Sequence, residues 1–282
     1  MDQWTTARAE MVEQQLHRRG ISDKRVLAAM ASVPRHIFVP ENEVNRAYWD
    51  GPLSIGYGQT ISQPYVVALT CELLEISENA KVLEIGAGSG YAAAVLGNLA
   101  DKVISIDRLQ ELVSLSRENL KQAGYRNVEV ICADGTLGCP PEAPFDAIAV
   151  AAGAPAVPDS LKKQLKVGGR LVIPVGRSKR QQDLIRIERL SEIEFKTDNL
   201  GAVAYVPLVG AEGWADAGAT ISGSTTSGLR ALARSRADLT PRRLLSVPPD
   251  EIAPTAFSPW RRPAVISITS ISNLSVLGKI PG

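Results

Sequence analysis

The sequence predicts an α/β protein with a doubly wound, mainly parallel β-sheet, N-terminal helices and a C-terminal extension. Short β-branched runs alternate with helical stretches from Ala80 onward, and a glycine-rich turn follows the first run. Six prolines fall between Pro241 and Pro263, where a long helix or central strand would be broken. Because strand, helix and strand joined at this rhythm form right-handed crossovers, we expect parallel strands in one sheet covered on both faces.

The composition is that of an ordinary globular protein. A formal net charge of +1 argues against binding to a nucleic-acid backbone, which usually needs a basic excess. The three cysteines include no C-x-x-C pair, so neither a disulfide framework nor a zinc site is predicted, and two histidines are too few for a histidine-based metal centre. Residues 1–10 have no apolar run typical of a secretory signal, and no stretch reaches the roughly 18 apolar residues of a membrane span. We therefore expect a cytoplasmic protein with reduced thiols, no metal, and no membrane or nucleic-acid partner.

Two helices are expected before the alternating region. Residues 3–19 place apolar side chains near helical spacing among polar neighbours, which predicts an amphipathic helix. Ser22 or Asp23 is expected to cap a second helix that continues to about Ala31 and stops before Pro34. Both helices are interpreted as packing elements.

The alternating region supplies the strands of the predicted sheet. Helical stretches at 92–100 and 109–124 separate the first three strands, and Gly124 is a typical helix stop. The expected strands are residues 81–86, 102–107, 128–134, 145–150 and 170–176, with further strands at 183–190 and 203–208.

The strongest functional signal is V-L-E-I-G-A-G-S-G-Y at 82–91, where glycines follow a strand and precede a helix. Glycine lets the backbone approach a ligand closely, and the helix start presents free N–H groups. A dinucleotide loop reads G-x-G-x-x-G, whereas this loop reads G-x-G-x-G and has Glu84 two residues before its first glycine. A carboxylate there would repel a pyrophosphate but would suit an ammonium or sulfonium group. S-adenosylmethionine carries both groups.

Acidic residues also end the next two strands. Asp107 is placed where a carboxylate can accept hydrogen bonds from ribose hydroxyls, and Asp134, before Gly135, where it can accept from an adenine amino group. The structural alternative is that each acid merely caps the helix that follows it. Three acids at three successive strand ends favour a cofactor site.

Five runs together resemble the protein-L-isoaspartate O-methyltransferase family. The likeness covers roughly residues 5–214, and its specific part is T-I-S-x-P, because many methyltransferases share the glycine loop. The runs are P-R-H-I-F-V-P (34–40), G-Q-T-I-S-Q-P (58–64), V-L-E-I-G-A-G-S-G-Y (82–91), F-D-A-I-A-V-A-A-G-A-P (145–155) and Q-L-K-V-G-G-R-L-V-I-P-V-G (164–176).

The resemblance implies a seven-stranded class I methyltransferase fold, which is Rossmann-like. The implied enzyme transfers a methyl group from S-adenosyl-L-methionine to the carboxylate of L-isoaspartyl residues in damaged proteins and peptides, and the ester then leads through a succinimide to aspartyl. We expect a methyltransferase domain at 1–216, with N-terminal helices and substrate loop in 1–79 and the cofactor-binding sheet in 80–216. Residues 217–282 are expected to be a Pro/Arg-rich extension or linker, which such enzymes usually lack.

The resemblance also implies the roles of single residues. Ser62 matches the active-site serine, with Thr60 beside it in the catalytic loop, and Gln63, Val206 and Pro207 are candidates for substrate binding. The alternative is that Ser62 caps a helix starting near Gln63, with Pro64 in its first position. The positions implied for the cofactor are Glu84, Gly86, Ala87, Gly88, Gly90, Asp107, Asp134 and Gly135.

Two other functions are compatible with the same fold. One is a methyltransferase for a small molecule or RNA, because fold does not fix substrate. The other is a catalytically silent adaptor that uses the long extension to dock, although the intact Glu84, Asp107, Asp134 and Ser62 argue against it. We expect a monomer, with association through the extension as an open alternative.

Overall fold

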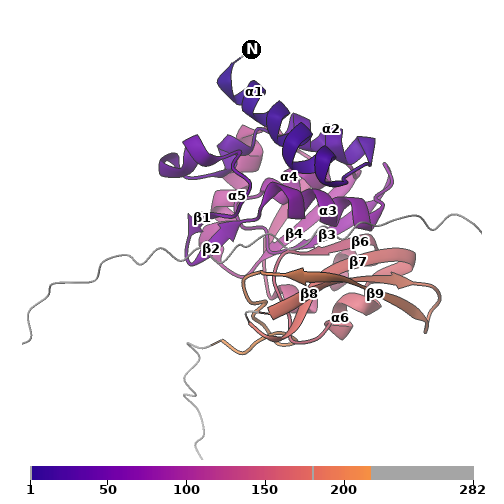
Figure 1. The fold of residues 1–282 in the computed structure, drawn as a ribbon. Helices are drawn as coiled ribbons and strands as arrows, with labels where there is room; N and C mark the ends of the chain where they lie inside the picture. Colours follow the sequence, from indigo (N-terminus) through magenta and orange to yellow (C-terminus); the bar gives the residue numbers. More distant parts are fainter. Residues whose placement is uncertain (1, 180, 217–282) are drawn as a thin grey trace, which may run out of the picture. The chain divides into compact units, whose positions relative to one another are not determined.

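The computed structural model describes residues 2–179 and 181–216, so the expected extension at 217–282 lies outside the described residues (Figure 1). Seven strands form one sheet in the order β5-β4-β3-β6-β7-β8-β9. The first five of these are parallel neighbours, and β8 and β9 pair antiparallel. The mainly parallel α/β fold is therefore confirmed. The strands are β3 (Lys81–Ile85), β4 (Lys102–Asp107), β5 (Val128–Cys132), β6 (Phe145–Val150), β7 (Leu165–Ser178), β8 (Gln181–Arg189) and β9 (Phe195–Val203).

The prediction for the last strand was wrong. We expected a strand at 203–208, but β9 ends at Val203, and Pro207 makes only an isolated bridge with Gly153. β9 is an edge strand in which no residue is buried, so it lacks the apolar alternation by which strands are recognised. The more apolar 203–208 segment contains a proline, which has no N–H for a ladder.

Helices precede the sheet and connect its strands. The first expected helix at 3–19 is confirmed, although it passes from α-helical to π-helical and then 3₁₀ geometry. Asp23, not Ser22, caps the second helix by accepting hydrogen bonds from the backbone N–H groups of Arg25 and Val26. The helices are α1 (Gln3–Glu10), α2 (Lys24–Ser32), α3 (Pro64–Leu74), α4 (Tyr91–Gly97), α5 (Gln110–Gln122) and α6 (Asp159–Lys163), with turns η1 (Met11–Leu16), η2 (His17–Arg19), η3 (Arg35–Phe38), η4 (Glu41–Arg46), η5 (Gly135–Leu137) and η6 (Pro140–Glu142).

The two faces of the sheet are covered unequally. Helices α1 to α5 lie on one side and the short α6 on the other (Figure 1). Valines and alanines of the strands, such as Val82 and Val103, pack under the larger helical layer, whereas Leu83, Ile85 and Ile104 face the α6 side. Alternate residues of the central strands thus enter two cores, as expected for a sheet buried on both faces.

A short antiparallel hairpin precedes α3. It consists of β1 (Leu53–Gly56) and β2 (Gln59–Ile61), which pair from Leu53 with Ile61. Ser62 and Gln63 follow directly, and Pro64 is the first residue of α3. The hairpin therefore delivers the segment predicted to be catalytic to the start of this helix.

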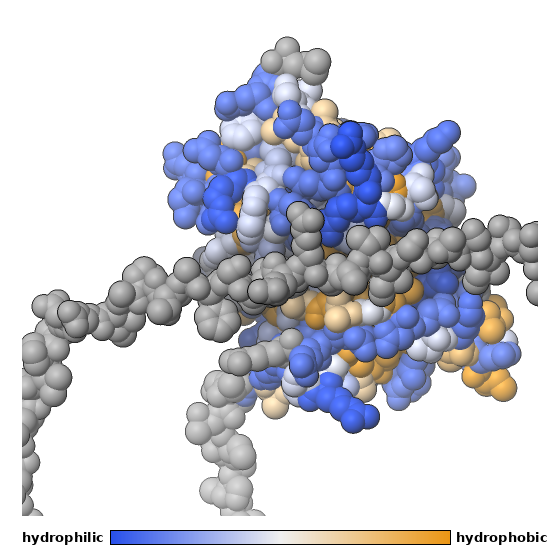
Figure 2. Space-filling view, in the orientation of Figure 1, coloured by the Kyte–Doolittle hydropathy of each residue, from blue (hydrophilic) through white to orange (hydrophobic). Residues whose placement is uncertain are grey.

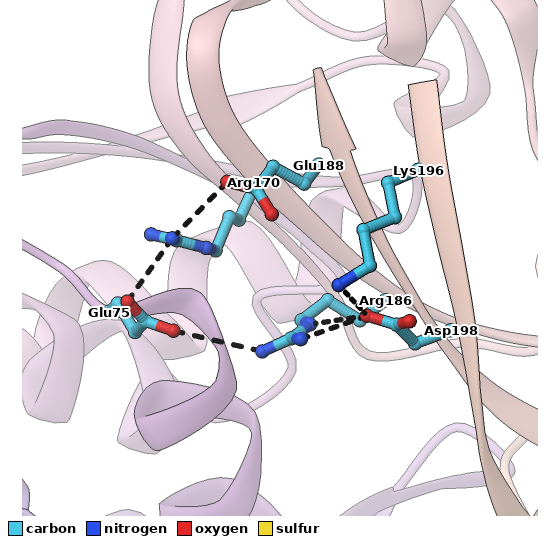
Figure 3. A network of polar contacts seen from close by, with 6 residues as sticks. All are labelled: Glu75, Arg170, Arg186, Glu188, Lys196 and Asp198. Atoms are coloured by element: carbon cyan, nitrogen blue, oxygen red, sulfur yellow. Dashed lines mark hydrogen bonds and ion pairs between the residues drawn. The ribbon is translucent and has the colours of Figure 1, made fainter. Parts of the chain in front are cut away.

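The other end of α3 is attached to the antiparallel strands by ion pairs (Figure 3). The helix stops at Glu75, which has a left-handed φ of 48°. The Glu75 carboxylate lies 3.1 Å from a guanidinium nitrogen of Arg170 on β7 and 3.7 Å from one of Arg186 on β8. Arg170 also pairs with Glu188, while Arg186 and Lys196 pair with Asp198.

The surface of the described residues differs between its two ends. Figure 2 shows mainly hydrophilic residues over the N-terminal helices and apolar residues at the end of the β8–β9 hairpin. Leu190 and Ile193, in the turn of that hairpin, are exposed to 45% and 92%. None of the helices in the described ranges is long and apolar enough to cross a membrane.

Candidate active site

A cavity of about 140 Å³ lies at the carboxyl ends of β3, β4 and β6. β4 and β6 flank β3 on opposite sides, so the chain's order reverses here, which is where open α/β sheets bind their ligands. Residues at or directly after the ends of these strands line the cavity, including Gly86, Asp107 and Ala151. The β2–α3 connection supplies another wall through Thr60 and Ser62.

The glycine loop forms one side of this cavity. Gly86, Ala87 and Gly88 line it, and the backbone N–H groups of Gly86 and Ala87 donate to the Ile106 carbonyl of β4. Gly90 does not line the cavity but caps α4, and a Cβ at this position would lie 3.2 Å from the Ser116 carbonyl oxygen of α5. In this structure Gly90 lets α4 pack closely against α5, and its role in cofactor binding stays a prediction.

Asp107 faces the cavity from the end of β4 and is 8% exposed. One carboxylate oxygen accepts a hydrogen bond of 2.9 Å from the Gly88 N–H, and the other accepts one of 3.0 Å from the Leu109 N–H. Helix α5 has no side-chain cap, so Asp107 does not play the capping role of the structural alternative. Asp107 stabilises the glycine loop, and its carboxylate oxygens can accept further hydrogen bonds from a ligand in the cavity.

Asp134 has the capping role that the alternative describes. It caps the 3₁₀ turn η5 by accepting hydrogen bonds from the N–H and hydroxyl of Thr136, and its other oxygen accepts from the Ala211 N–H at 2.7 Å. Partial burial opposes ionisation, but these hydrogen bonds hold the pKa of Asp134 below its usual value. Asp134 is not a lining residue, whereas Gly135 is.

Glu84 is buried behind the glycine loop, with 1% of its surface exposed, and does not itself line the cavity. The Ser105 hydroxyl donates to one of its carboxylate oxygens. The other oxygen is buried and has no hydrogen-bond partner among the residues that the structure describes. Burial raises the pKa of Glu84 to about 8, despite the hydrogen bond from Ser105.

The serine segment forms the opposite wall. Thr60 and Ser62 both line the cavity. The first helical residue after them is Pro64, the N-cap position is Gln63, and α3 has no side-chain cap. The Ser62 hydroxyl therefore does not cap α3, and the capping alternative is wrong for this residue.

Gln63 is not brought to the cavity. Its side-chain amide donates a hydrogen bond of 2.7 Å to the Asp50 carboxylate. Asp50 also forms an ion pair of 3.0 Å with Arg19, and the Arg19 guanidinium lies 3.9 Å from the ring centre of Tyr65. In this structure the side chain of Gln63 links the N-terminal helices to the start of α3.

Val206 and Pro207 do line the cavity, although they lie outside any strand. Gln182 of β8, which is 3% exposed, holds this segment by accepting from the Tyr205 N–H at 2.8 Å and donating to the Tyr205 carbonyl at 3.2 Å. The Gly153 N–H donates to the Val206 carbonyl at 2.8 Å. The buried amide of Gln182 and the backbone of Gly153 thus hold this segment together.

Several lining residues were not singled out from the sequence. Tyr91 begins α4, Arg108 follows the acid of β4, and Ala151 and Ala152 follow β6. The signal for the last three was available, because Arg108 and Ala151 come directly after predicted parallel strands, where ligand sites gather, and Ala152 follows Ala151. Arg108 also forms an ion pair of 3.1 Å with Asp216.

The residues present fit S-adenosylmethionine. A buried carboxylate oxygen without a partner, on Glu84, lies beside a loop whose backbone is open to close approach, and Asp107 offers a second acceptor. Ile85, Ile106 and Leu112 give the cavity apolar walls. Within residues 2–179 and 181–216 no group of three or more His, Cys, Asp or Glu side chains is arranged to hold a metal ion.

Comparisons with known proteins agree with this arrangement. The family model described as Protein-L-isoaspartate(D-aspartate) O-methyltransferase matches residues 6–213. A Protein-L-isoaspartate O-methyltransferase 2 of Marinobacter nauticus is 58% identical over 207 residues, which are 73% of this chain and 94% of the relative. A Protein-L-isoaspartate O-methyltransferase of Syntrophus aciditrophicus is 50% identical over 216 residues, 76% of this chain and 99% of the relative.

Two solved structures are similar over most of the described residues. One is a protein-L-isoaspartate O-methyltransferase with a TM-score of 0.68 and 28% identity, covering 73% of this chain and 67% of the other. The second is described as a putative protein-L-isoaspartate O-methyltransferase from Plasmodium falciparum in complex with S-adenosyl-L-homocysteine. Its TM-score is 0.63 at 27% identity, and the match covers 74% of this chain and 99% of the other.

Proposed function

The chain belongs to the protein-L-isoaspartate(D-aspartate) O-methyltransferase family, and from this premise we propose that the cavity between the glycine loop and the Ser62 segment is its active site. The reaction transfers a methyl group from S-adenosyl-L-methionine to the carboxylate of L-isoaspartyl residues in proteins and peptides, and so begins their repair to aspartyl. The observation that carries the proposal is that Thr60 and Ser62 line the same cavity as Gly86, Gly88 and Asp107.

In this proposal, the cofactor binds on the side of the cavity that the glycine loop forms. The carboxylate of Asp107 supplies negative charge toward a cationic ligand, and Gly86 to Gly88 leave room for it. The buried carboxyl group of Glu84, whose raised pKa favours its protonated form, becomes ionised when the cation binds beside it. When bound, S-adenosylmethionine supplies a methyl group on a positively charged sulfur. Asp134, which precedes the lining residue Gly135, contributes indirectly by fixing the segment around Ala211 through a hydrogen bond.

The substrate side of the reaction needs orientation rather than proton transfer. A carboxyl group has a pKa near 4, so the attacking carboxylate is already ionised at neutral pH and no general base is required. In the proposal, the hydroxyls of Ser62 and Thr60 donate hydrogen bonds that orient this carboxylate. Val206 and Pro207 contact the substrate from the facing segment. Apolar walls exclude water from the attack, which favours neutralisation of charge in the transition state.

The role of Ser62 is tested by Ser62→Ala. We expect turnover of an isoaspartyl peptide to fall by about tenfold or more, since orientation of the nucleophile is lost. The affinity for S-adenosyl-L-homocysteine, measured by calorimetry, should stay close to that of the unmodified chain. Unchanged turnover would remove the role assigned to this hydroxyl.

The assay that separates this function from its rivals uses labelled cofactor and matched peptides. Label on an isoaspartyl peptide, with none on the aspartyl form, agrees with the proposal. Label on RNA or a small molecule instead identifies a different methyltransferase. Cofactor binding without transfer to any of them identifies an adaptor.

We further propose that the chain acts as a monomer in the cytoplasm and that residues 1–216 form the complete methyltransferase domain. Cys71, Cys132 and Cys139 are all free thiols, which suits a reducing compartment. Family matching over 6–213 supports the domain boundary. Light scattering on the full chain and on a version ending at 216 tests the monomer proposal, because association through 217–282 would appear only in the full chain. Methylation of an isoaspartyl peptide by the shorter version tests whether residues 1–216 are the complete domain.

A further inference from the structure

Arg35 is a fully buried cation that holds the serine segment. Its guanidinium is 0% exposed, and its Nη2 donates a hydrogen bond of 2.8 Å to the Ser62 carbonyl. Its Nε donates one of 2.7 Å to the Ala47 carbonyl. Because Pro64 restricts the residue before it, the main chain is fixed directly after the Ser62 carbonyl as well. The Ser62 side chain is left with little freedom besides rotation about its own bonds.

The same guanidinium also contacts the cofactor side of the cavity. It lies over the ring of Tyr91, 4.5 Å from the ring centre. Tyr91 lines the cavity, begins α4 and follows the glycine loop directly. The Tyr91 hydroxyl in turn donates to the sulfur of Met30 in the helical layer. Arg35 therefore connects the wall that carries Ser62 to the wall that carries the glycine loop.

The burial of this cation is poorly compensated. No carboxylate in the described part of the chain forms an ion pair with Arg35, and its Nη1 is buried without a hydrogen-bond partner. Arginine stays protonated in proteins, so the charge cannot be relieved by losing a proton. A buried charge with only carbonyl and aromatic partners is costly, and well-packed apolar residues often replace buried charges without loss of stability. Its geometry beside Ser62 explains why an arginine stands here.

We propose that Arg35 is a positioning residue for methyl transfer, holding Ser62 in register with the glycine loop through the Ser62 carbonyl and the Tyr91 ring. This inference rests on the proposed function of the cavity. Arg35 touches neither reacting group, and it acts on the reaction through the placement of the Ser62 hydroxyl. Its loss should therefore affect turnover more than cofactor binding.

The test compares Arg35→Met with Arg25→Met. Arg25 is a matched control, because its guanidinium also donates to two backbone carbonyls, those of Ile76 and Leu99. These carbonyls precede β3 and β4, at the end of the sheet opposite the cavity. Both variants lose an arginine that joins two backbone segments, but only one of these arginines reaches the serine segment.

We expect Arg35→Met to lower kcat for an isoaspartyl peptide by about tenfold to a hundredfold, since a misplacement of ~1 Å has effects of this size. The dissociation constant for S-adenosyl-L-homocysteine should change by less than about threefold. Arg25→Met should keep the kcat of the unmodified chain. All assays are made at a temperature at which circular dichroism shows the variant folded.

Arg35→Lys keeps the positive charge on a single donor nitrogen but lacks the planar fork that reaches both carbonyls. We expect Arg35→Lys to have a kcat between those of Arg35→Met and the unmodified chain, which would support positioning by this side chain. If Arg35→Met does not fold, Arg35→Lys takes its place in the comparison with Arg25→Met. The inference is overturned if folded Arg35 variants retain full kcat, or if they lose no more than Arg25→Met. If the unmodified chain itself does not methylate the peptide, the proposed function fails instead, which distinguishes the two outcomes.

Discussion

The two ends of helix α3 are held by opposite means. At its start, one buried guanidinium, that of Arg35, holds the Ser62 carbonyl without a carboxylate partner. At its end, Glu75 joins a network of six charged residues in which its own side chain is 55% exposed (Figure 3). The first end carries the proposed catalytic segment, and the second attaches the helix to β7 and β8.

This difference shows that the number of charges at a contact is a poor guide to how much the contact contributes to stability. Exposed ion pairs are screened by water and salt, and each contributes little, whereas a buried polar group is costly when its partner is removed. We therefore expect the fully buried Arg35 to contribute more to stability and to activity than the network at Glu75, whose six side chains are 21–55% exposed. Three changes test this expectation, from the largest effect to the smallest.

Arg35→Ala should have the largest effect on stability. The change leaves the Ala47 and Ser62 carbonyls without their donor and opens a cavity beneath Tyr91. We expect the free energy of unfolding to fall by about 3 kcal/mol. Urea denaturation followed by circular dichroism measures it. A loss below that of the network change at Glu75 would reverse the comparison.

Glu84→Gln sharpens the comparison by changing a second buried ionisable group. In the native chain the pKa of Glu84 is about 8, against a usual value of 4.5, so between these pH values the native chain keeps a proton that the unfolded chain has released. Raising the pH therefore favours unfolding across this window, and the loss is complete above about pH 8.

Because glutamine does not titrate, we expect the unfolding free energy of Glu84→Gln to lack this decline. Denaturation of both proteins at about pH 5, 7 and 9 should show the variant gaining on the unmodified chain as pH rises. If the unfolding free energies of the two proteins changed with pH in parallel, the pKa of Glu84 would not be raised by burial.

Glu75→Gln should have the smallest effect. Glu75 contacts Arg170 at 3.1 Å and Arg186 at 3.7 Å, but those arginines keep Glu188 and Asp198 as partners. We expect a loss of less than about 1 kcal/mol, which shrinks further when salt is added. The measurement is the urea midpoint at low and high salt. Arg18→Gln is a suitable control, since the side chains of its ion pair with Glu13 are more than half exposed and lie outside this network.

Much of the fold followed from local pattern. The buried central strands are short β-branched runs, so their periodicity and the glycine turn between them were visible in the sequence. The edge strand β9 was missed because exposure on both faces removes that periodicity. β7 is also longer than the expected 170–176, because it begins at Leu165 beside Phe145 of β6 and continues to Ser178 in the hairpin with β8.

The candidate site likewise contains residues that the sequence predicted and residues that it did not. Residues directly after strands, such as Gly86 and Asp107, reach the cavity as predicted, and the family motif supplied Ser62 and Thr60. Gln63 points instead to Asp50 because a neighbouring charge binds its amide. The contacts of Arg35 and Gln182 join segments far apart in the chain, and no local pattern signals such contacts.

The buried oxygen of Glu84 without a partner has a consequence for how cofactor loading is observed. A cation bound beside this carboxylate favours its ionised form, so near neutral pH loading expels a proton into the solution. Isothermal titration would then give a heat that changes with the protonation enthalpy of the chosen buffer. Cofactor binding and proton release are therefore thermodynamically coupled in this molecule.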